Sequence, residues 1–161
     1  MTLTDYNKSV DQYSDNIYRF ILKNIKDEDK AKDIVQETYI KLWNKVEEVS
    51  AEKVKSYLFT TAYRTMIDMI RRDKRLTDFD ELDQSNMIHT NQYSDLKEIL
   101  NEAINKLPEK QKSVILLRDY EGYSYQEIAD ITGMNESQVK VYIYRARVFL
   151  KGKLKSIDLL I

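Results

Sequence analysis

The amino-acid sequence predicts an all-α protein of two small helical domains, an N-terminal bundle of three to four helices and a C-terminal helix-turn-helix domain. Only three glycines and one proline occur in 161 residues, so few residues interrupt helices. Apolar residues recur at helical spacing through most of the chain. The polar, acidic stretch 77–95 lacks this spacing, and we expect it to be a flexible linker between domains 1–76 and 96–161.

Composition excludes several classes of function. The chain has no cysteine, so it can form neither a disulfide nor a thiolate zinc site, and it has no cysteine nucleophile. Its one histidine, His89, lies in the linker, and no P-loop or nucleophile–base pair is present. We therefore expect no enzyme activity, no cofactor and no metal site. No apolar run reaches the ~18–20 residues that span a bilayer, and no signal-peptide pattern is present, which predicts a cytoplasmic protein without direct membrane insertion.

The formal net charge of −1 hides an uneven distribution of charge. Residues 1–75 carry 15 Lys and Arg against 13 Asp and Glu, residues 76–95 carry five acids and no base, and residues 96–161 carry 11 bases against nine acids. Four of the bases fall within 71–75, and six fall within 140–155 without any acid. Because phosphate binding depends on local clusters, two mildly basic domains joined by an acidic strip remain compatible with nucleic-acid binding.

Apolar stripes predict three helices in the N-terminal domain. The first stripe runs from Tyr13 to Ile25, the second from Ala31 to Val46 and the third from Val54 to Met69. The third helix carries a further apolar line, through Phe59, Tyr63, Met66 and Ile70. It is therefore expected either to lie at the centre of the bundle or to reserve one face for a ligand. Core positions are also expected at Trp43, Leu58 and Ala62.

Two further helices are expected before the helix-turn-helix. The first runs from Leu96 to Leu107, and Pro108 begins the second, because proline is favoured in a first helical turn. Apolar residues at 114–117 give the second helix a broad buried side, and 121–123 forms a turn.

Residues 124–150 carry the local signals of a helix-turn-helix. Ser124 and Glu127 fit a capping box at the start of a short helix. Gly133 stands where the chain must turn, because glycine adopts a left-handed conformation at little cost. Asn135 and Gln138 fit a second reciprocal cap. The helix that follows is expected to bury Val139, Ile143, Ala146 and Leu150.

The other side of this last helix carries side chains suited to the major groove of DNA. Glutamine can pair with adenine edges, and lysine and arginine with guanine or phosphate. The candidate DNA-binding residues are Ser137, Gln138, Lys140, Val141, Tyr144, Arg145 and Arg147. The alternative interpretation is an ordinary helical hairpin whose basic face is only solvated.

Four segments resemble the extracytoplasmic-function (ECF) group of bacterial sigma factors, the smallest members of that family. The segment DYEGYSYQEIADITGMNESQVKVYIYRARVFL is similar to the domain that reads the promoter −35 element, and INKLPEKQKSVILLRDYEG to its lead-in. KDIVQETYIKLW resembles the polymerase-binding helix, and KSYLFTTAYRTMIDMIRRDKR the helix that reads the −10 element and opens the strands. The resemblance covers nearly the whole chain in the family's order.

The resemblance implies a polymerase-docking site on the second helix. The family triplet that docks on the clamp helices of the largest polymerase subunit is matched by Asp33, Gln36 and Glu37. From the residues alone, Asp33 and Glu37 lie one turn apart on one face. A solvated acidic face paired with Lys30, Lys32 or Lys41 is the alternative.

The resemblance also implies that the third helix binds the −10 element, with aromatic rings stacked on unpaired bases and arginines on phosphates. The residues so implied are Tyr57, Phe59, Tyr63, Arg64, Arg71, Arg72 and Arg75. The family usually has asparagine in place of Arg64 and tryptophan in place of Tyr57. Arg64 lies one turn from Asp68, so it can pair with that carboxylate instead of reading a base.

The implied function is that of a sigma factor, which binds core RNA polymerase, recognises −35 and −10 promoter elements and promotes strand opening. The implied partners are the clamp helices, the flap of the second-largest polymerase subunit, promoter DNA and an anti-sigma factor. The acidic linker is implied to thread the RNA path of the polymerase, although a merely soluble linker explains it as well. A regulator that binds duplex DNA alone and dimerises through its N-terminal half is the other functional reading.

Overall fold

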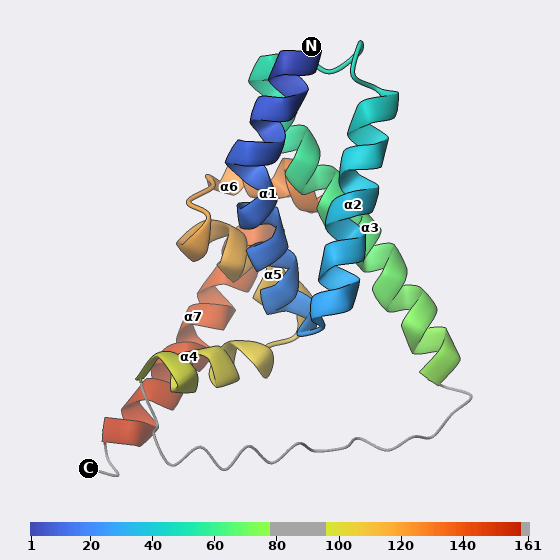
Figure 1. The fold of residues 1–161 in the computed structure, drawn as a ribbon. Helices are drawn as coiled ribbons and strands as arrows, with labels where there is room; N and C mark the ends of the chain where they lie inside the picture. The colour runs from blue at the N-terminus through green and yellow to red at the C-terminus, as the bar shows by residue number, and fades with distance from the viewer. Residues whose placement is uncertain (78–95, 159–161) are drawn as a thin grey trace.

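The computed structural model describes residues 1–77 and 96–158 (Figure 1). Within these two ranges the chain forms helices and turns and no strand, so the predicted all-α class is confirmed. Apart from Thr77, the predicted linker 77–95 lies outside the described residues, and His89 lies there with it. None of the helices described is long and apolar enough to cross a membrane.

Three long helices build the N-terminal part: α1 (Leu3–Ile25), α2 (Glu28–Asn44) and α3 (Val54–Thr77), with the short 3-10 helix η1 (Ala51–Lys53) before the third. Helix α1 begins ten residues before its apolar stripe. A capping box between Thr2 and Asp5 starts it, with hydrogen bonds of 3.0 and 3.1 Å. Its first turns then pack through Tyr6, whose hydroxyl donates to the Tyr39 carbonyl at 3.1 Å.

The first half of helix α3 lies at the centre of the molecule, as one of the two expected alternatives has it, whereas its last turns project from the bundle and are largely exposed (Figure 1). It packs against α1 and α2 on one side and against α6 (Tyr125–Thr132) on another. Leu58 and Ala62 are fully buried, as predicted. Trp43 was predicted to be buried, but its side chain is 51% exposed. Trp43 lies near the end of α2. Its ring meets the ring of Tyr6 edge to face, with the centroids 5.2 Å apart.

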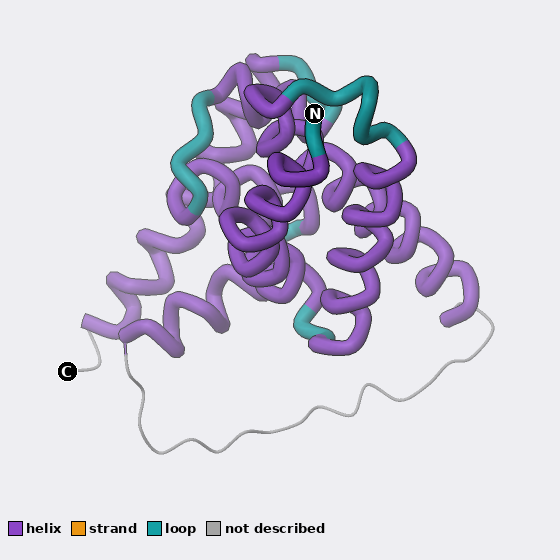
Figure 2. Tube along the Cα trace, turned by 45° about the horizontal axis from the view of Figure 1, so that its top comes forward, coloured by secondary structure: helices purple, strands orange, loops and turns teal. Residues whose placement is uncertain are grey.

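The C-terminal part consists of α4 (Leu96–Asn105), α5 (Glu109–Ile115), the π-helical turn η2 (Leu116–Tyr120), α6 and α7 (Glu136–Asp158). Pro108 is the N-cap of α5 rather than its first residue. Helix α7 packs against α4, α5 and α6, and short loops join these elements (Figure 2). The shared core is made by Val114, Ile115, Leu117, Ile128, Ile131, Val139, Ile143 and Ala146.

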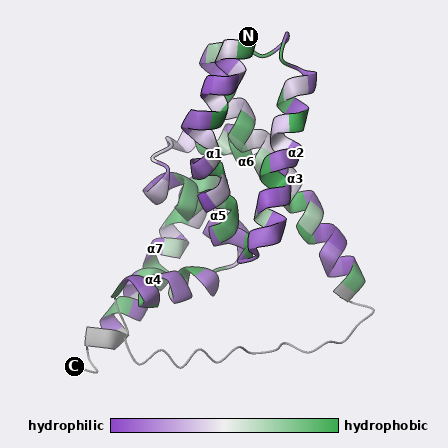
Figure 3. Ribbon diagram, in the orientation of Figure 1, coloured by the Kyte–Doolittle hydropathy of each residue, from purple (hydrophilic) through white to green (hydrophobic). Residues whose placement is uncertain are grey.

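The two parts pack against each other and share one hydrophobic core. Helix α3 contacts α6, and α1 contacts α5 and η2. The ring of Phe59 meets that of Tyr123 at this boundary, with centroids 5.3 Å apart. Hydrophobic residues gather where the helices face one another, and hydrophilic residues cover their outer faces (Figure 3). We call this packing of the two parts against each other the closed arrangement. Burial of both aromatic rings stabilises it, because apolar surface is removed from water.

Candidate nucleic-acid interface

The helix-turn-helix has the local geometry that its residues predict. Ser124 Oγ accepts from the Glu127 amide at 3.1 Å, while the Glu127 carboxylate accepts from the Ser124 amide at 3.0 Å. Gly133 ends α6 in the left-handed conformation, with φ of 78°. The Asn135 and Gln138 side chains accept from each other's amides at 2.8 and 3.1 Å. These caps fix the angle at which α7 leaves the turn.

All seven residues predicted to bind DNA on α7 are exposed on one continuous surface. They lie on the side of α7 that faces away from the buried residues Val139, Ile143 and Ala146. Tyr144 is 70% exposed. A shallow hollow of about 260 Å³ between Ser137, Gln138, Val141 and Arg145 also includes Tyr142, which sequence reasoning did not single out.

Two of these side chains are held by acidic partners. Arg147 forms an ion pair of 2.7 Å with Asp119, which raises the pKa of the guanidinium further above its usual value. Lys140 lies 3.6 Å from Glu136. Arg145 takes part in no ion pair within the described ranges. The Arg147 partner is 28 residues away in the chain, so no local pattern could have indicated it.

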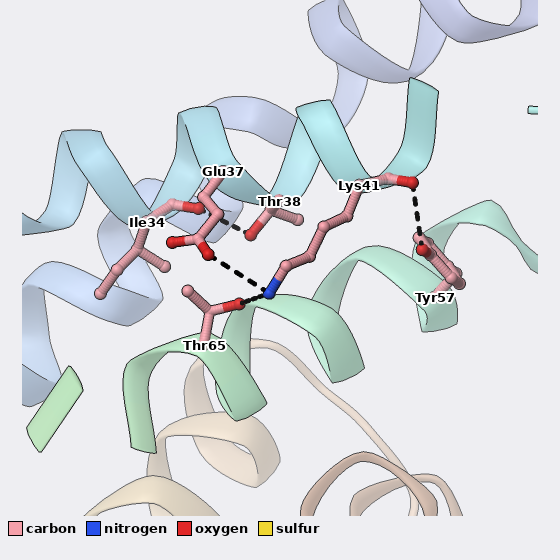
Figure 4. Close-up of polar contacts among 6 residues, drawn as sticks. All are labelled: Ile34, Glu37, Thr38, Lys41, Tyr57 and Thr65. Atoms are coloured by element: carbon pink, nitrogen blue, oxygen red, sulfur yellow. Dashed lines mark hydrogen bonds and ion pairs between the residues drawn. The ribbon is translucent and has the colours of Figure 1, made fainter. Parts of the chain in front are cut away.

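The predicted polymerase-docking triplet lies on the outer face of α2. Asp33 and Gln36 are exposed, and Glu37 is half-buried. Glu37 Oε1 lies 3.5 Å from Lys41 Nζ, which also donates to Thr65 Oγ1 of α3 at 3.0 Å (Figure 4). Asp33 has no ion pair in the described part of the chain. Within the described residues, the lysine pairing that the alternative expects is thus present at Glu37 and absent at Asp33.

The residues predicted on α3 divide into an exposed and a buried group. Arg64, Arg71, Arg72 and Arg75 are exposed, and Tyr57 is half-buried with its hydroxyl 3.4 Å from the Lys41 carbonyl. Phe59 is completely buried between the rings of Phe20 and Tyr123, and Tyr63 is 5% exposed. Burial raises the pKa of Tyr63 to about 12. In this arrangement neither buried ring is open to a base.

The exposed arginines of α3 form no ion pair with a carboxylate of the described residues. Arg64 and Asp68, one turn apart, form no ion pair among the described residues. Asp68 instead lines a cleft of about 500 Å³ between α2 and α3. Lys41 and Arg71 line the same cleft, so the docking face of α2 and the basic face of α3 are neighbours. Within the described ranges no cluster of acidic and histidine side chains could hold a metal.

Comparison with known proteins shows where this architecture recurs. Residues 10–76 match the family described as Sigma-70 region 2, and residues 97–150 match Sigma-70 region 4. The RNA polymerase sigma factor SigV of Bacillus subtilis is 34% identical over 153 residues, covering 93% of this chain and 91% of SigV. The ECF RNA polymerase sigma factor SigM of that organism is 30% identical, covering 87% and 89%. The chain belongs to the ECF RNA polymerase sigma factors.

Solved structures resemble this sigma factor over both regions. The sigma factor RpoE of Bartonella quintana, determined in complex with the anti-sigma factor NepR, is 27% identical with a TM-score of 0.80, covering 95% of this chain and 98% of RpoE. CnrH, determined with the cytosolic domain of CnrY, shares the fold at 21% identity and a TM-score of 0.68, covering 94% and 88%. Region 2 of this sigma factor spans α1 to α3, and region 4 spans α4 to most of α7.

These findings establish the general function and explain the two surfaces. The protein is a sigma factor for promoter recognition and transcription initiation. Region 4 contains the helix-turn-helix with its exposed face on α7, and region 2 contains the acidic face of α2 beside the basic face of α3.

Proposed function

We propose that this sigma factor docks on core RNA polymerase through Asp33, Gln36 and Glu37, and reads the −35 element with α7 and the −10 element with α3. The observation that carries the proposal is the exposed face of α7 on a fully capped helix-turn-helix, in a chain with regions 2 and 4 in the family's order. The domain limits that we assign are 1–76, 77–95 and 96–161.

Docking on polymerase is assigned to α2 because its triplet is accessible and only partly neutralised. Asp33 and Gln36 are exposed, and among the described residues Glu37 forms an ion pair with Lys41 alone, at 3.5 Å. A surface pair of this kind, with both side chains nearly half exposed, contributes little to stability, so a partner can displace it. We infer that the partner is the clamp-helix pair of the largest polymerase subunit, and that region 4 meets the flap of the second-largest.

Reading of the −35 element is assigned to the exposed residues of α7. Arg145 and Gln138 flank the shallow hollow at the start of the helix and supply donors and an acceptor for base edges. Lys140 and Arg147 lie 3.6 and 2.7 Å from acidic partners, and we assign them to phosphates, which fix register after displacing these carboxylates. Ser137, Val141 and Tyr144 complete the surface.

Binding of the −10 element is assigned to α3. Tyr57, Arg64, Arg71, Arg72 and Arg75 can meet DNA in the arrangement described, since each is at least partly exposed. Phe59 and Tyr63 lie under region 4, so they can stack on bases only after region 4 has moved away from α3. Stacking is worth ~1–3 kcal/mol per base, comparable to the cost of extruding one, so strand opening needs no ATP.

Restraint by an anti-sigma factor is proposed from a solved relative, because RpoE was determined in complex with the anti-sigma factor NepR. The sigma factor itself is proposed to be non-catalytic and to act in the cytoplasm, where RNA polymerase works. The sequence contains one histidine and no cysteine, so these residue types supply no nucleophile–base pair.

Transcription with purified core polymerase on a library of −35 and −10 sequences tests the proposal. Glu37→Lys should abolish initiation by preventing docking, whereas Glu52→Lys, the same charge reversal at an exposed residue of η1, should not. Arg145→Ala should lower initiation roughly 5- to 150-fold, from the ~1–3 kcal/mol of a base contact, and relax the −35 preference.

Lys8→Ala, which removes an exposed base of α1, is the control for Arg145→Ala and should leave initiation unchanged. Absence of initiation by the wild-type protein, together with tight binding of the protein alone to duplex DNA, would refute the proposal and favour a stand-alone regulator.

A further inference from the structure

A basic cleft lies between the docking helix α2 and the −10 helix α3. The term basic cleft is used for the hollow of about 500 Å³ lined by Lys41, Thr65, Arg71, Arg72 and Arg75 together with Glu37 and Asp68. Four of the seven lining residues are bases and two are acids, so the lining is net positive. None of the three arginines forms an ion pair within residues 1–77 and 96–158, which leaves their charge available to an anion.

Lys41 differs from the other bases of the cleft because it comes from α2 and is held in place. Its Nζ donates to Thr65 Oγ1 at 3.0 Å and lies 3.5 Å from Glu37 Oε1 (Figure 4). Thr65 is only 2% exposed, so its hydroxyl is a fixed anchor on the neighbouring helix. A lysine normally loses much side-chain freedom when it binds a ligand. Here a part of that freedom is already lost before any ligand arrives.

We propose that Lys41 is a further DNA-binding residue, which holds a backbone phosphate of the −10 strand in the basic cleft opposite Arg71, Arg72 and Arg75. The proposal rests on the proposed function, which places these arginines on −10 DNA. A phosphate is the ligand that the cleft fits, because an ammonium group from one helix and guanidinium groups from the other line it. Lys41 reads no base and contributes affinity and register.

Glu37 connects this phosphate site with polymerase docking. Its carboxylate belongs to the docking triplet and lies 3.5 Å from the Lys41 ammonium. When Glu37 turns to the polymerase, Lys41 keeps its bond to Thr65 but loses the neighbouring negative charge. The basic cleft then becomes more positive, so the holoenzyme binds the −10 strand more tightly than the free sigma factor does. The coupling is reciprocal, because both partners act on one ion pair.

The test measures binding of the holoenzyme to a promoter fork whose −10 strand is unpaired, across a series of salt concentrations. Core polymerase is added until each sigma variant is fully assembled, so a docking defect cannot mimic a DNA defect. Lys41→Gln removes the charge but keeps a donor for Thr65. Lys41→Arg keeps the charge. Lys32→Gln is the matched control, since Lys32 is an exposed lysine nine residues earlier, on the opposite side of α2.

Lys41→Gln is expected to bind the fork several-fold more weakly, with a log–log salt slope shallower by about 0.7, the value for one phosphate contact on a single strand. Lys41→Arg and Lys32→Gln should keep the wild-type slope. A wild-type slope for fully assembled Lys41→Gln would overturn the proposal while leaving the proposed function standing. If the wild-type holoenzyme itself did not bind the fork, the proposed function would fail and Lys41 with it.

Discussion

Phe59 of region 2 and Tyr123 of region 4 meet edge to face, with ring centroids 5.3 Å apart and planes inclined by 70°. Both rings are buried, and Lys55 Nζ lies over the ring of Tyr123, 4.7 Å from its centroid. One aromatic pair thus joins α3 to the residue that precedes the helix-turn-helix. Because this contact belongs to a continuous core, we expect the two regions to unfold together in the free protein.

Tyr123→Phe should stabilise the closed arrangement. The Tyr123 hydroxyl is buried and has no hydrogen-bond partner among the described residues, and such a group costs about 1–3 kcal/mol. Phenylalanine keeps the ring contact with Phe59 and removes the hydroxyl. We expect a higher free energy of unfolding, by about 1 kcal/mol, in urea denaturation. Tyr120→Phe, at a residue with 41% exposure, is the control and should change little. A lower stability for Tyr123→Phe would contradict the assignment of an unsatisfied hydroxyl.

Asn24→Ala should loosen the contact between the regions. Asn24 is buried at the end of α1, where its Oδ1 accepts from Ser113 Oγ at 2.9 Å and its Nδ2 donates to the Phe20 carbonyl at 2.7 Å. Alanine leaves the Ser113 hydroxyl buried without this acceptor, at a cost of about 1–3 kcal/mol. A double-mutant cycle with Ser113→Ala measures the effect. The two changes should be less than additive, and strict additivity would show that the bond contributes nothing.

Gly133→Ala should weaken both the fold and −35 binding. An added Cβ at Gly133 would meet no atom within 4 Å, so the cost comes from its φ of 78° alone, about 1–2 kcal/mol. Gly152→Ala is the matched control, because Gly152 lies inside α7, also with nothing within 4 Å of an added Cβ. There alanine should stabilise by roughly 0.5–1 kcal/mol. Thermal denaturation distinguishes the two, and equal effects at both positions would contradict the prediction.

Tyr63 should make the protein sensitive to alkaline pH. Burial raises the pKa of its phenol from 10.0 to about 12, so the folded state keeps the proton where the unfolded chain has released it. Its contribution is therefore fully present below pH 10 and is lost as the pH rises from 10 towards 12. Tyr63→Phe should flatten the fall of unfolding free energy over that interval. Tyr39 and Tyr123, whose pKa values burial also raises, keep part of that fall in the variant, but curves of equal slope for wild type and variant would rule out a contribution from Tyr63.

Local signals made the helix-turn-helix predictable in detail. Ser124, Glu127, Gly133, Asn135 and Gln138 act within four residues of their partners, so spacing along the chain specified their contacts. The exposed face of α7 followed from the same periodicity. The onset of α1 was missed because its first turns carry few apolar residues, and a capping box at Thr2 and Asp5 begins it instead.

Contacts between distant segments were not predictable. The partner of Arg147 is Asp119, and the hydroxyl of Ser113 reaches Asn24 across 89 positions of the chain. Trp43 shows the same limit in reverse, because helical periodicity placed it on an apolar line although the neighbouring elements leave it 51% exposed. Such pairings depend on where whole helices come to rest, which the spacing of residues in one helix does not encode.

The sequence by itself determined the helices, the caps of the helix-turn-helix, the acidic face of α2, the basic face of α3 and the family to which they belong. Only the tertiary structure decided which of those residues are accessible. It placed Phe59 and Tyr63 beneath region 4 and left Arg64, Arg71 and Arg145 in solvent. The physical reason is that aromatic side chains serve equally well to fill a core or to stack on a base, and only the packing of region 4 on α3 assigns them to the core.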